Sequence, residues 1–233
     1  MKDKSSVLVG MVFILAALLG SWALSLGASA SEEAQSESAV VLTHDKTAMP
    51  QFVYNPDSIS EDSVAGEKRY GAAQSGAADP VVAAVGSTVV VRGRISGVYY
   101  TFIGGTAWTQ ADLRVTESLK GTLAAGDIIS VYFPGGYAST ADYAGYYGAQ
   151  DGETGSDASF YRFSVDLLAP PAQGDEDLLF LIQRPGSAIP EGAYSLSRGA
   201  YSVYSFSADA QSLEGAGGQY SYSELRQLIR RGA

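Results

Sequence analysis

The side chains that could do chemistry gather in one stretch of the chain, residues 137–158, which is rich in Gly, Tyr and Asp. Tyrosine offers a large amphipathic surface at a small entropic cost, and such surfaces suit sugar or protein binding. We therefore predict a ligand-binding surface made of Tyr137, Tyr143, Tyr146 and Tyr147. The alternative is that these tyrosines only cover the sheet, because singly exposed aromatic side chains are ordinary on protein surfaces.

Carboxylates in the same stretch indicate two further chemistries. Oxygen ligands at alternate positions are typical of calcium loops, although this stretch lacks the central glycine and the final glutamate of an EF-hand. Calcium is therefore the one cofactor that we predict, and its ligands would be Asp151, Glu153 and Asp157. The alternative is a solvated acidic loop that binds no ion. A glycosidase would instead need two rigid carboxyl groups about 5–10 Å apart, drawn from these three and Asp142.

Other catalytic side chains are scarce. His44 is the one histidine, and it lies in an acidic segment that is poorly suited to holding a Ser-His-Asp triad rigidly. The chain has no cysteine, which excludes disulfides, thiolate nucleophiles and cysteine-ligated zinc. The sequence therefore predicts no catalytic residue and favours a protein that is not an enzyme.

The net charge of the chain limits its partners. It is −10 at pH 7, and an acidic surface repels the phosphates of nucleic acids and of anionic lipids. We expect no nucleic-acid partner. A protein or a glycan at the cell surface is the partner that is compatible with this negative net charge.

The N-terminus has the order of a secretory signal. Lys2 and Lys4 precede an uncharged apolar run over residues 7–26, and Ala28-Ser29-Ala30 forms a small-x-small cleavage pattern. Residues 1–30 are therefore predicted to be a signal peptide; an uncleaved anchor is the alternative, because the run could span a membrane. Both readings place the remainder outside the cytoplasm, secreted or anchored to the cytoplasmic membrane by this segment alone.

The elements that must position the candidate residues begin after an acidic stretch. Residues 31–80 carry nine acidic and three basic side chains and are predicted to be a flexible tether, with residues 49–54 docking on the domain. Residues 81–233 form the domain. Period-2 alternation and apolar runs predict strands over residues 89–99, 106–119, 129–133, 160–167, 178–182, 193–197 and 201–207.

Residues 137–158 are expected to be a long loop, and an amphipathic stripe predicts a C-terminal helix over residues 222–231. Short strands with glycine-rich turns and one terminal helix indicate an all-β fold. We expect a small Greek-key barrel of the OB type, or a sandwich, with the C-terminal helix covering the sheet.

Four sequence blocks carry a resemblance: residues 89–95, 113–121, 126–131 and 177–181. Together they resemble a class of exported proteins from Gram-positive and actinobacterial genomes. The order of the blocks is similar to that of netrin-type OB barrels, a fold also seen in tissue inhibitors of metalloproteases. The resemblance covers roughly residues 81–207 and implies a barrel. Those eukaryotic proteins depend on cysteines that this chain lacks, so protease inhibition is not implied.

The sequence therefore favours a non-catalytic extracytoplasmic binding or interaction module on an acidic tether. The alternative from another class is a carboxylate-dependent hydrolase that acts on cell-envelope glycans. A third interpretation is a purely structural protein of the cell envelope, which would have no saturable ligand.

Overall fold

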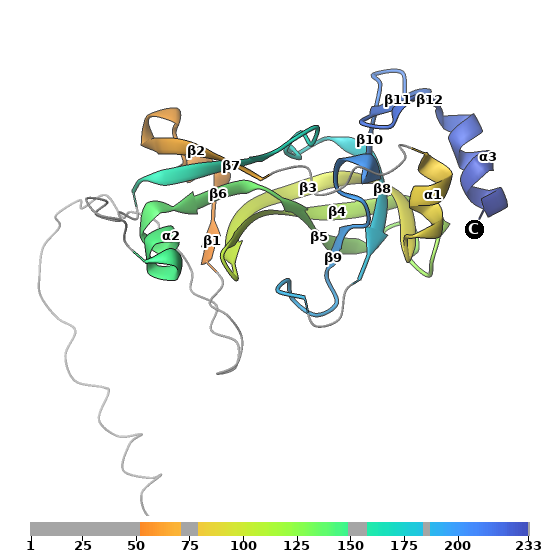
Figure 1. Cartoon of the computed structure of the whole chain (residues 1–233). Helices are drawn as coiled ribbons and strands as arrows, with labels where there is room; N and C mark the ends of the chain where they lie inside the picture. The colour runs from red at the N-terminus through yellow and green to blue at the C-terminus, as the bar shows by residue number, and fades with distance from the viewer. Residues whose placement is uncertain (1–51, 71–78, 149–157, 184–186, 233) are drawn as a thin grey trace, which may run out of the picture. The chain divides into compact units, whose positions relative to one another are not determined.

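The computed structural model describes residues 52–70, 79–148, 158–183 and 187–232 (Figure 1). The predicted signal peptide or anchor at residues 1–30 lies outside these ranges, as do residues 31–51 of the predicted tether. Within the described ranges, no helix is long and apolar enough to span a membrane.

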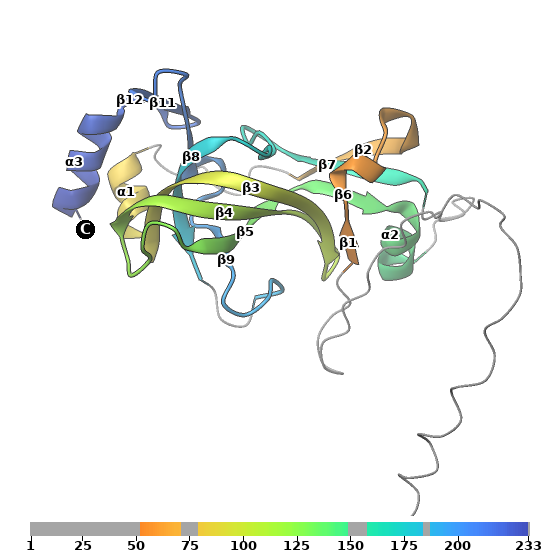
Figure 2. The same ribbon diagram turned by 180° about the vertical axis from the view of Figure 1, so that it is seen from behind.

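A closed ring of five strands forms the centre of the domain. These strands are β3 (Val89–Ile103), β4 (Thr106–Lys120), β5 (Ile128–Pro134), β8 (Glu176–Ile182) and β9 (Tyr194–Leu196). Strands β3, β4 and β5 pair antiparallel in chain order, β5 pairs parallel with β9, and β8 pairs antiparallel with β9 and with β3 (Figure 2). This closed Greek-key ring is an OB-like barrel, so the predicted all-β fold class is confirmed.

Alternating apolar side chains fill the barrel. Ile95 of β3 and Leu113 of β4 belong to the buried core, whereas their neighbour Arg114 is exposed. Strand β8 is buried on both faces, as its continuous apolar run predicted: Leu179 faces the barrel core, and Phe180 faces a second core under the C-terminal helix. Period-2 patterning therefore located the barrel strands to within a few residues.

A second sheet, in the order β2-β7-β6, packs against the far ends of β3 and β4. Strands β2 (Val64–Tyr70) and β7 (Phe160–Val165) are parallel, and β7 pairs antiparallel with β6 (Gly136–Ser139). Helix α2 (Thr140–Tyr147) follows β6 directly. A third buried cluster joins this sheet to the barrel hairpin; its members are Phe102, Ala107, Ala138, Tyr161 and Phe163.

The tether prediction differs from the structure over residues 52–70. This part holds β1 (Phe52–Tyr54), two short 3-10 helices, η1 (Pro56–Ser58) and η2 (Glu61–Ser63), and β2. Strand β1 pairs with the end of β3, as expected for a segment that docks on the domain. Exposed positions of β2, among them Glu67 and Arg69, alternate with half-buried ones, among them Lys68, so a polar composition concealed an edge strand.

The prediction of one long loop over residues 137–158 is wrong for the part that the structure describes. Residues 137–139 belong to β6, and residues 140–147 form α2. Ser139 caps the helix, since its hydroxyl accepts a hydrogen bond from the Asp142 amide at 3.0 Å. Residues 149–157 lie outside the described residues.

The C-terminal part covers the other side of β8. The 3-10 helix η3 (Gly199–Ser202) and strands β10 (Val203–Phe206), β11 (Ser212–Gly215) and β12 (Gly218–Ser221) lead to α3 (Tyr222–Gly232). Helix α1 (Pro80–Val85), which precedes β3 in the chain, packs beside α3. Leu225 and Ile229 of α3 are fully buried in the second core beside α1. The C-terminal helix therefore lies where its apolar stripe predicted, against the sheet.

Candidate functional site

Three of the four predicted tyrosines lie together on α2. Tyr143, Tyr146 and Tyr147 are spaced so that residues three and four apart share one helix face. The rings of Tyr143 and Tyr147 lie 4.7 Å apart between centroids, and those of Tyr146 and Tyr147 lie 4.9 Å apart. We call this group, Tyr143, Tyr146 and Tyr147, the tyrosine surface.

Tyr143 anchors the tyrosine surface to the second sheet. Its ring packs edge-on against Tyr161 of β7 at 5.2 Å. The ammonium group of Lys68 on β2 lies 4.3 Å from the ring centroid of Tyr143 and 4.3 Å from that of Tyr161. A cation between two aromatic faces is held by the negative potential of both rings, so Lys68 fixes the helix to the second sheet.

Tyr146 and Tyr147 form the exposed part of the surface, with 50% and 56% of their areas accessible. Both side chains contact the hairpin that joins the first two barrel strands, β3 and β4. The Tyr147 hydroxyl donates a hydrogen bond to the Gly105 carbonyl at 2.7 Å, and the Tyr146 ring lies where a Cβ of residue 105 would be. Residue 105 must be glycine for two reasons: its φ of +81° is unfavourable for other residues, and a side chain there would collide with the Tyr146 ring. The two rings are therefore both exposed and fixed in place.

Two hydroxyl groups at or near this surface, those of Tyr147 and Tyr70, have raised pKa values. Partial burial, with smaller contributions from Tyr143 and Tyr146, raises the pKa of Tyr147 above its ordinary value. Burial also raises the pKa of Tyr70, whose hydroxyl accepts a hydrogen bond from the Ala107 amide, to about 12. The raised pKa favours the neutral form of the Tyr147 hydroxyl. The surface therefore offers apolar ring faces together with hydroxyl groups.

Tyr137 does not join the tyrosine surface. It lies on β6, where its ring packs on Tyr100 at 4.8 Å and its hydroxyl accepts a hydrogen bond from Arg162 at 2.8 Å. Arg162 also pairs with Glu61. This chain of contacts holds the second sheet to β3 and to the segment before β2.

The carboxylates of the hydrolase and calcium predictions do not form a site among the described residues. Asp142 completes the cap of α2, since its carboxylate accepts a hydrogen bond from Ser139 at 2.6 Å. Asp151, Glu153 and Asp157 lie outside the described residues. In the part of the chain that the structure describes, no three His, Asp or Glu side chains are grouped to hold a metal ion.

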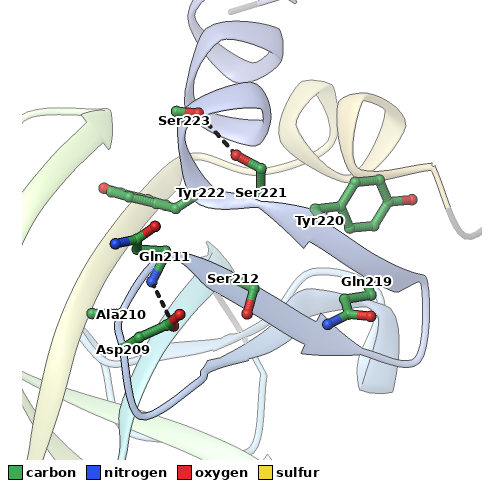
Figure 3. Close-up of a pocket in the computed structure, with 9 residues that line it drawn as sticks. All are labelled: Asp209, Ala210, Gln211, Ser212, Gln219, Tyr220, Ser221, Tyr222 and Ser223. Atoms are coloured by element: carbon green, nitrogen blue, oxygen red, sulfur yellow. Dashed lines mark hydrogen bonds between the residues drawn. The ribbon is translucent and has the colours of Figure 1, made fainter.

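A wide hollow of about 760 Å³ lies on the hairpin β11–β12 and the start of α3 (Figure 3). Its polar groups bond to one another: Ser221 with Ser223 at 2.8 Å, and the Gln211 amide with the Asp209 carboxylate at 3.1 Å. The hollow is open, and two further hydroxyl groups that line it, those of Ser212 and Tyr222, bond to Ser207 and Glu117 outside it. It is a weaker candidate for ligand binding than the tyrosine surface.

Sequence reasoning named the tyrosines but missed the residues that position them. Lys68 stands in a segment that was expected to be a tether, and Tyr161 stands in a strand with no mark of function. The hairpin turn that Tyr146 and Tyr147 contact is formed by Gly104 and Gly105, both with positive φ angles. Comparisons with protein families, with curated proteins and with solved structures found no match for this chain.

Proposed function

We propose that this protein is a non-catalytic, extracytoplasmic binding module that holds a cell-surface glycan on the tyrosine surface. The observation that carries the proposal is the pair Tyr146 and Tyr147, which are half exposed and fixed against the barrel hairpin. Rigid aromatic side chains bind with little loss of entropy, because their rotamers are already set.

The position of the surface supports a glycan as the ligand. OB-type barrels commonly bind oligonucleotides or oligosaccharides through the loop between their first two strands, and this is the loop that Tyr146 and Tyr147 contact. That support is an analogy of fold. The net charge of −10 disfavours the polyanionic alternative, so a neutral or weakly charged polysaccharide is the better fit.

The chemistry of the tyrosines supports the same class. The apolar face of a tyrosine ring complements the C–H face of a sugar ring, while its hydroxyl group can exchange hydrogen bonds with sugar hydroxyls. The predicted export signal would place the domain where such polymers occur, outside the cytoplasm.

A sedimentation assay with insoluble cell-envelope polysaccharide tests the proposal. The wild type should bind saturably, and the double variant Tyr146→Ala, Tyr147→Ala should bind about tenfold or more weakly, since buried aromatic anchors each contribute more than about 1 kcal/mol. The matched control is Tyr99→Ala. Tyr99 is also an exposed tyrosine, at 38%, but strand alternation directs it to the face of β3 opposite Phe102.

Two results would contradict the proposal. Equal loss of binding in the Tyr99 variant and in the double variant would mean that the tyrosine surface is not the site. Release of new reducing ends by the wild type would show catalysis and favour the hydrolase alternative.

A further inference from the structure

A second, smaller pocket lies between the barrel and the C-terminal hairpin and has a volume of about 210 Å³. Segment 167–171, Leu-Leu-Ala-Pro-Pro, forms one apolar wall, and Phe133 and Val203 contribute further apolar surface. Three carboxylates also line the pocket: Asp175, Asp177 and Glu214. None of the described residues that line it carries a positive charge.

Asp177 is the unusual member of this group. It lies in the middle of the sheet, paired with Gly93 of β3 on one side and Ser205 of β10 on the other, and only 3% of its area is exposed. Its Oδ1 atom has no hydrogen-bond partner. Burial raises the pKa of Asp177 to about 6, against a smaller opposing effect of a hydrogen bond with Ser205. A buried carboxylate oxygen without a partner costs free energy that a donor would recover.

The pocket is preformed. Gly174 donates a hydrogen bond from its amide to the Ile95 carbonyl, and the Ile95 amide donates to the Asp175 carbonyl, both at 2.9 Å. The Asp175 carboxylate accepts from the Ala172 amide at 2.8 Å. Leu168 packs on the barrel core, while Leu167, 69% exposed, is held at a φ of +64°, where leucine is strained. Backbone strain of this kind gathers at binding sites.

We propose that this pocket binds one primary ammonium group on an apolar stem, as on a lysine side chain or a simple alkylamine. The carboxylates supply the countercharge, and the wall of Leu168, Pro170 and Pro171 fits a methylene chain. A compact ammonium group can donate to the one oxygen of Asp177 that has no partner, Oδ1, whereas a guanidinium group binds a carboxylate best through both oxygens, and Asp177 already bonds to Ser205. Anions are excluded by the charge of the lining.

This site is independent of the proposed glycan binding. It is built from β8, β10 and the segment after β7, and it shares no residue with the tyrosine surface. Loss of one binding activity would therefore leave the other intact.

Nuclear magnetic resonance titration of the full chain with n-butylammonium, with an N-acetyl-lysine amide and with an N-acetyl-arginine amide tests the assignment. Both amines should bind saturably at neutral pH and shift the resonances of residues 167–177 and 205. The variant Asp177→Asn should bind about tenfold or more weakly, because hydrogen bonds to a charged group are the strong ones. Glu224→Gln, an exposed acid on α3, is the matched control and should bind like the wild type.

The outcomes separate the sources of the ammonium group. Binding of both amines supports recognition of the ammonium and its stem, and binding of the lysine amide alone assigns the site to a peptide side chain. Absence of both at millimolar concentration would overturn the proposal, as would unchanged binding in Asp177→Asn or equal binding of the arginine amide. Glu214→Gln, at the exposed rim of the pocket, provides a second variant, with a smaller expected loss of binding.

Discussion

Asp177 shows how one residue can oppose the stability of the fold that contains it. Below the pKa of an unfolded aspartate, about 4, the side chain is protonated in both states and burial costs little. As the pH rises through about 6, the buried carboxylate ionises against the desolvation penalty, so the cost is complete above that pH.

The variant Asp177→Asn should therefore gain stability relative to the wild type as the pH rises from about 4 to neutral. The raised pKa, about two units above the ordinary value, corresponds to a gain of up to about 3 kcal/mol in the difference between their free energies of unfolding. Urea denaturation of both proteins at the two pH values measures it. A difference that does not change with pH would contradict a raised pKa for Asp177.

At the same scale, residue types predicted the tyrosine surface better than they predicted its supports. Tyr143, Tyr146 and Tyr147 stand close in the sequence, so composition alone could single them out. Lys68 and Asp177 could not be found in this way. Each acquires its role from a long-range contact, Lys68 from the ring of Tyr143 and Asp177 from burial between β3 and β10. A single sequence carries no signal of such contacts.

At the scale of elements, β3 closes the barrel because it bends. Its pairing with β4 shifts register at three places, one of them between Arg92 and Gly93. A Cβ at residue 93 would lie 2.7 Å from Leu113 Cγ and 2.8 Å from the Arg114 carbonyl oxygen. The close approach of the two strands at this point therefore requires glycine.

The variant Gly93→Ala should lose about 1–3 kcal/mol of unfolding free energy, because the added methyl group overpacks a rigid ladder. The matched control is Gly145→Ala in α2, where a Cβ would meet nothing within 4 Å. That change should be neutral or should stabilise the protein by about 0.5–1 kcal/mol, since alanine favours helix. Thermal denaturation compares the three proteins. A control that loses as much as Gly93→Ala would refute the packing argument.

Elements whose own residues show an apolar pattern could be predicted from the sequence. Elements that depend on packing against distant parts of the chain could not. Period-2 alternation or a continuous apolar run predicts the barrel strands β3, β4, β5 and β8. Helix α2 has no apolar stripe; a serine cap and the packing of Tyr143 hold it. Strand β2, Val-Ala-Gly-Glu-Lys-Arg-Tyr, is too polar to be recognised as a strand without its partner β7.

At the scale of the whole domain, the barrel carries an insertion of β6, α2 and β7 between its third and fourth strands, and β2, from before the barrel, completes the second sheet. The insertion is part of the packed structure, because Ala138, Tyr161 and Phe163 share a buried cluster with the barrel hairpin. Deleting residues 138–157 would therefore remove half of β6 and all of α2, and would destabilise the domain as well as remove the tyrosine surface. Point variants on the exposed rings are the sharper test of function.

The most direct measurement is a titration of the isotope-labelled protein with soluble oligosaccharides released from cell-envelope polysaccharide, followed by nuclear magnetic resonance. Binding at the tyrosine surface predicts saturable shifts at Gly104, Gly105 and residues 143–148, with little change at residues 209–223 around the open hollow. Shifts confined to residues 209–223, or absent at every concentration, would contradict the proposed binding surface.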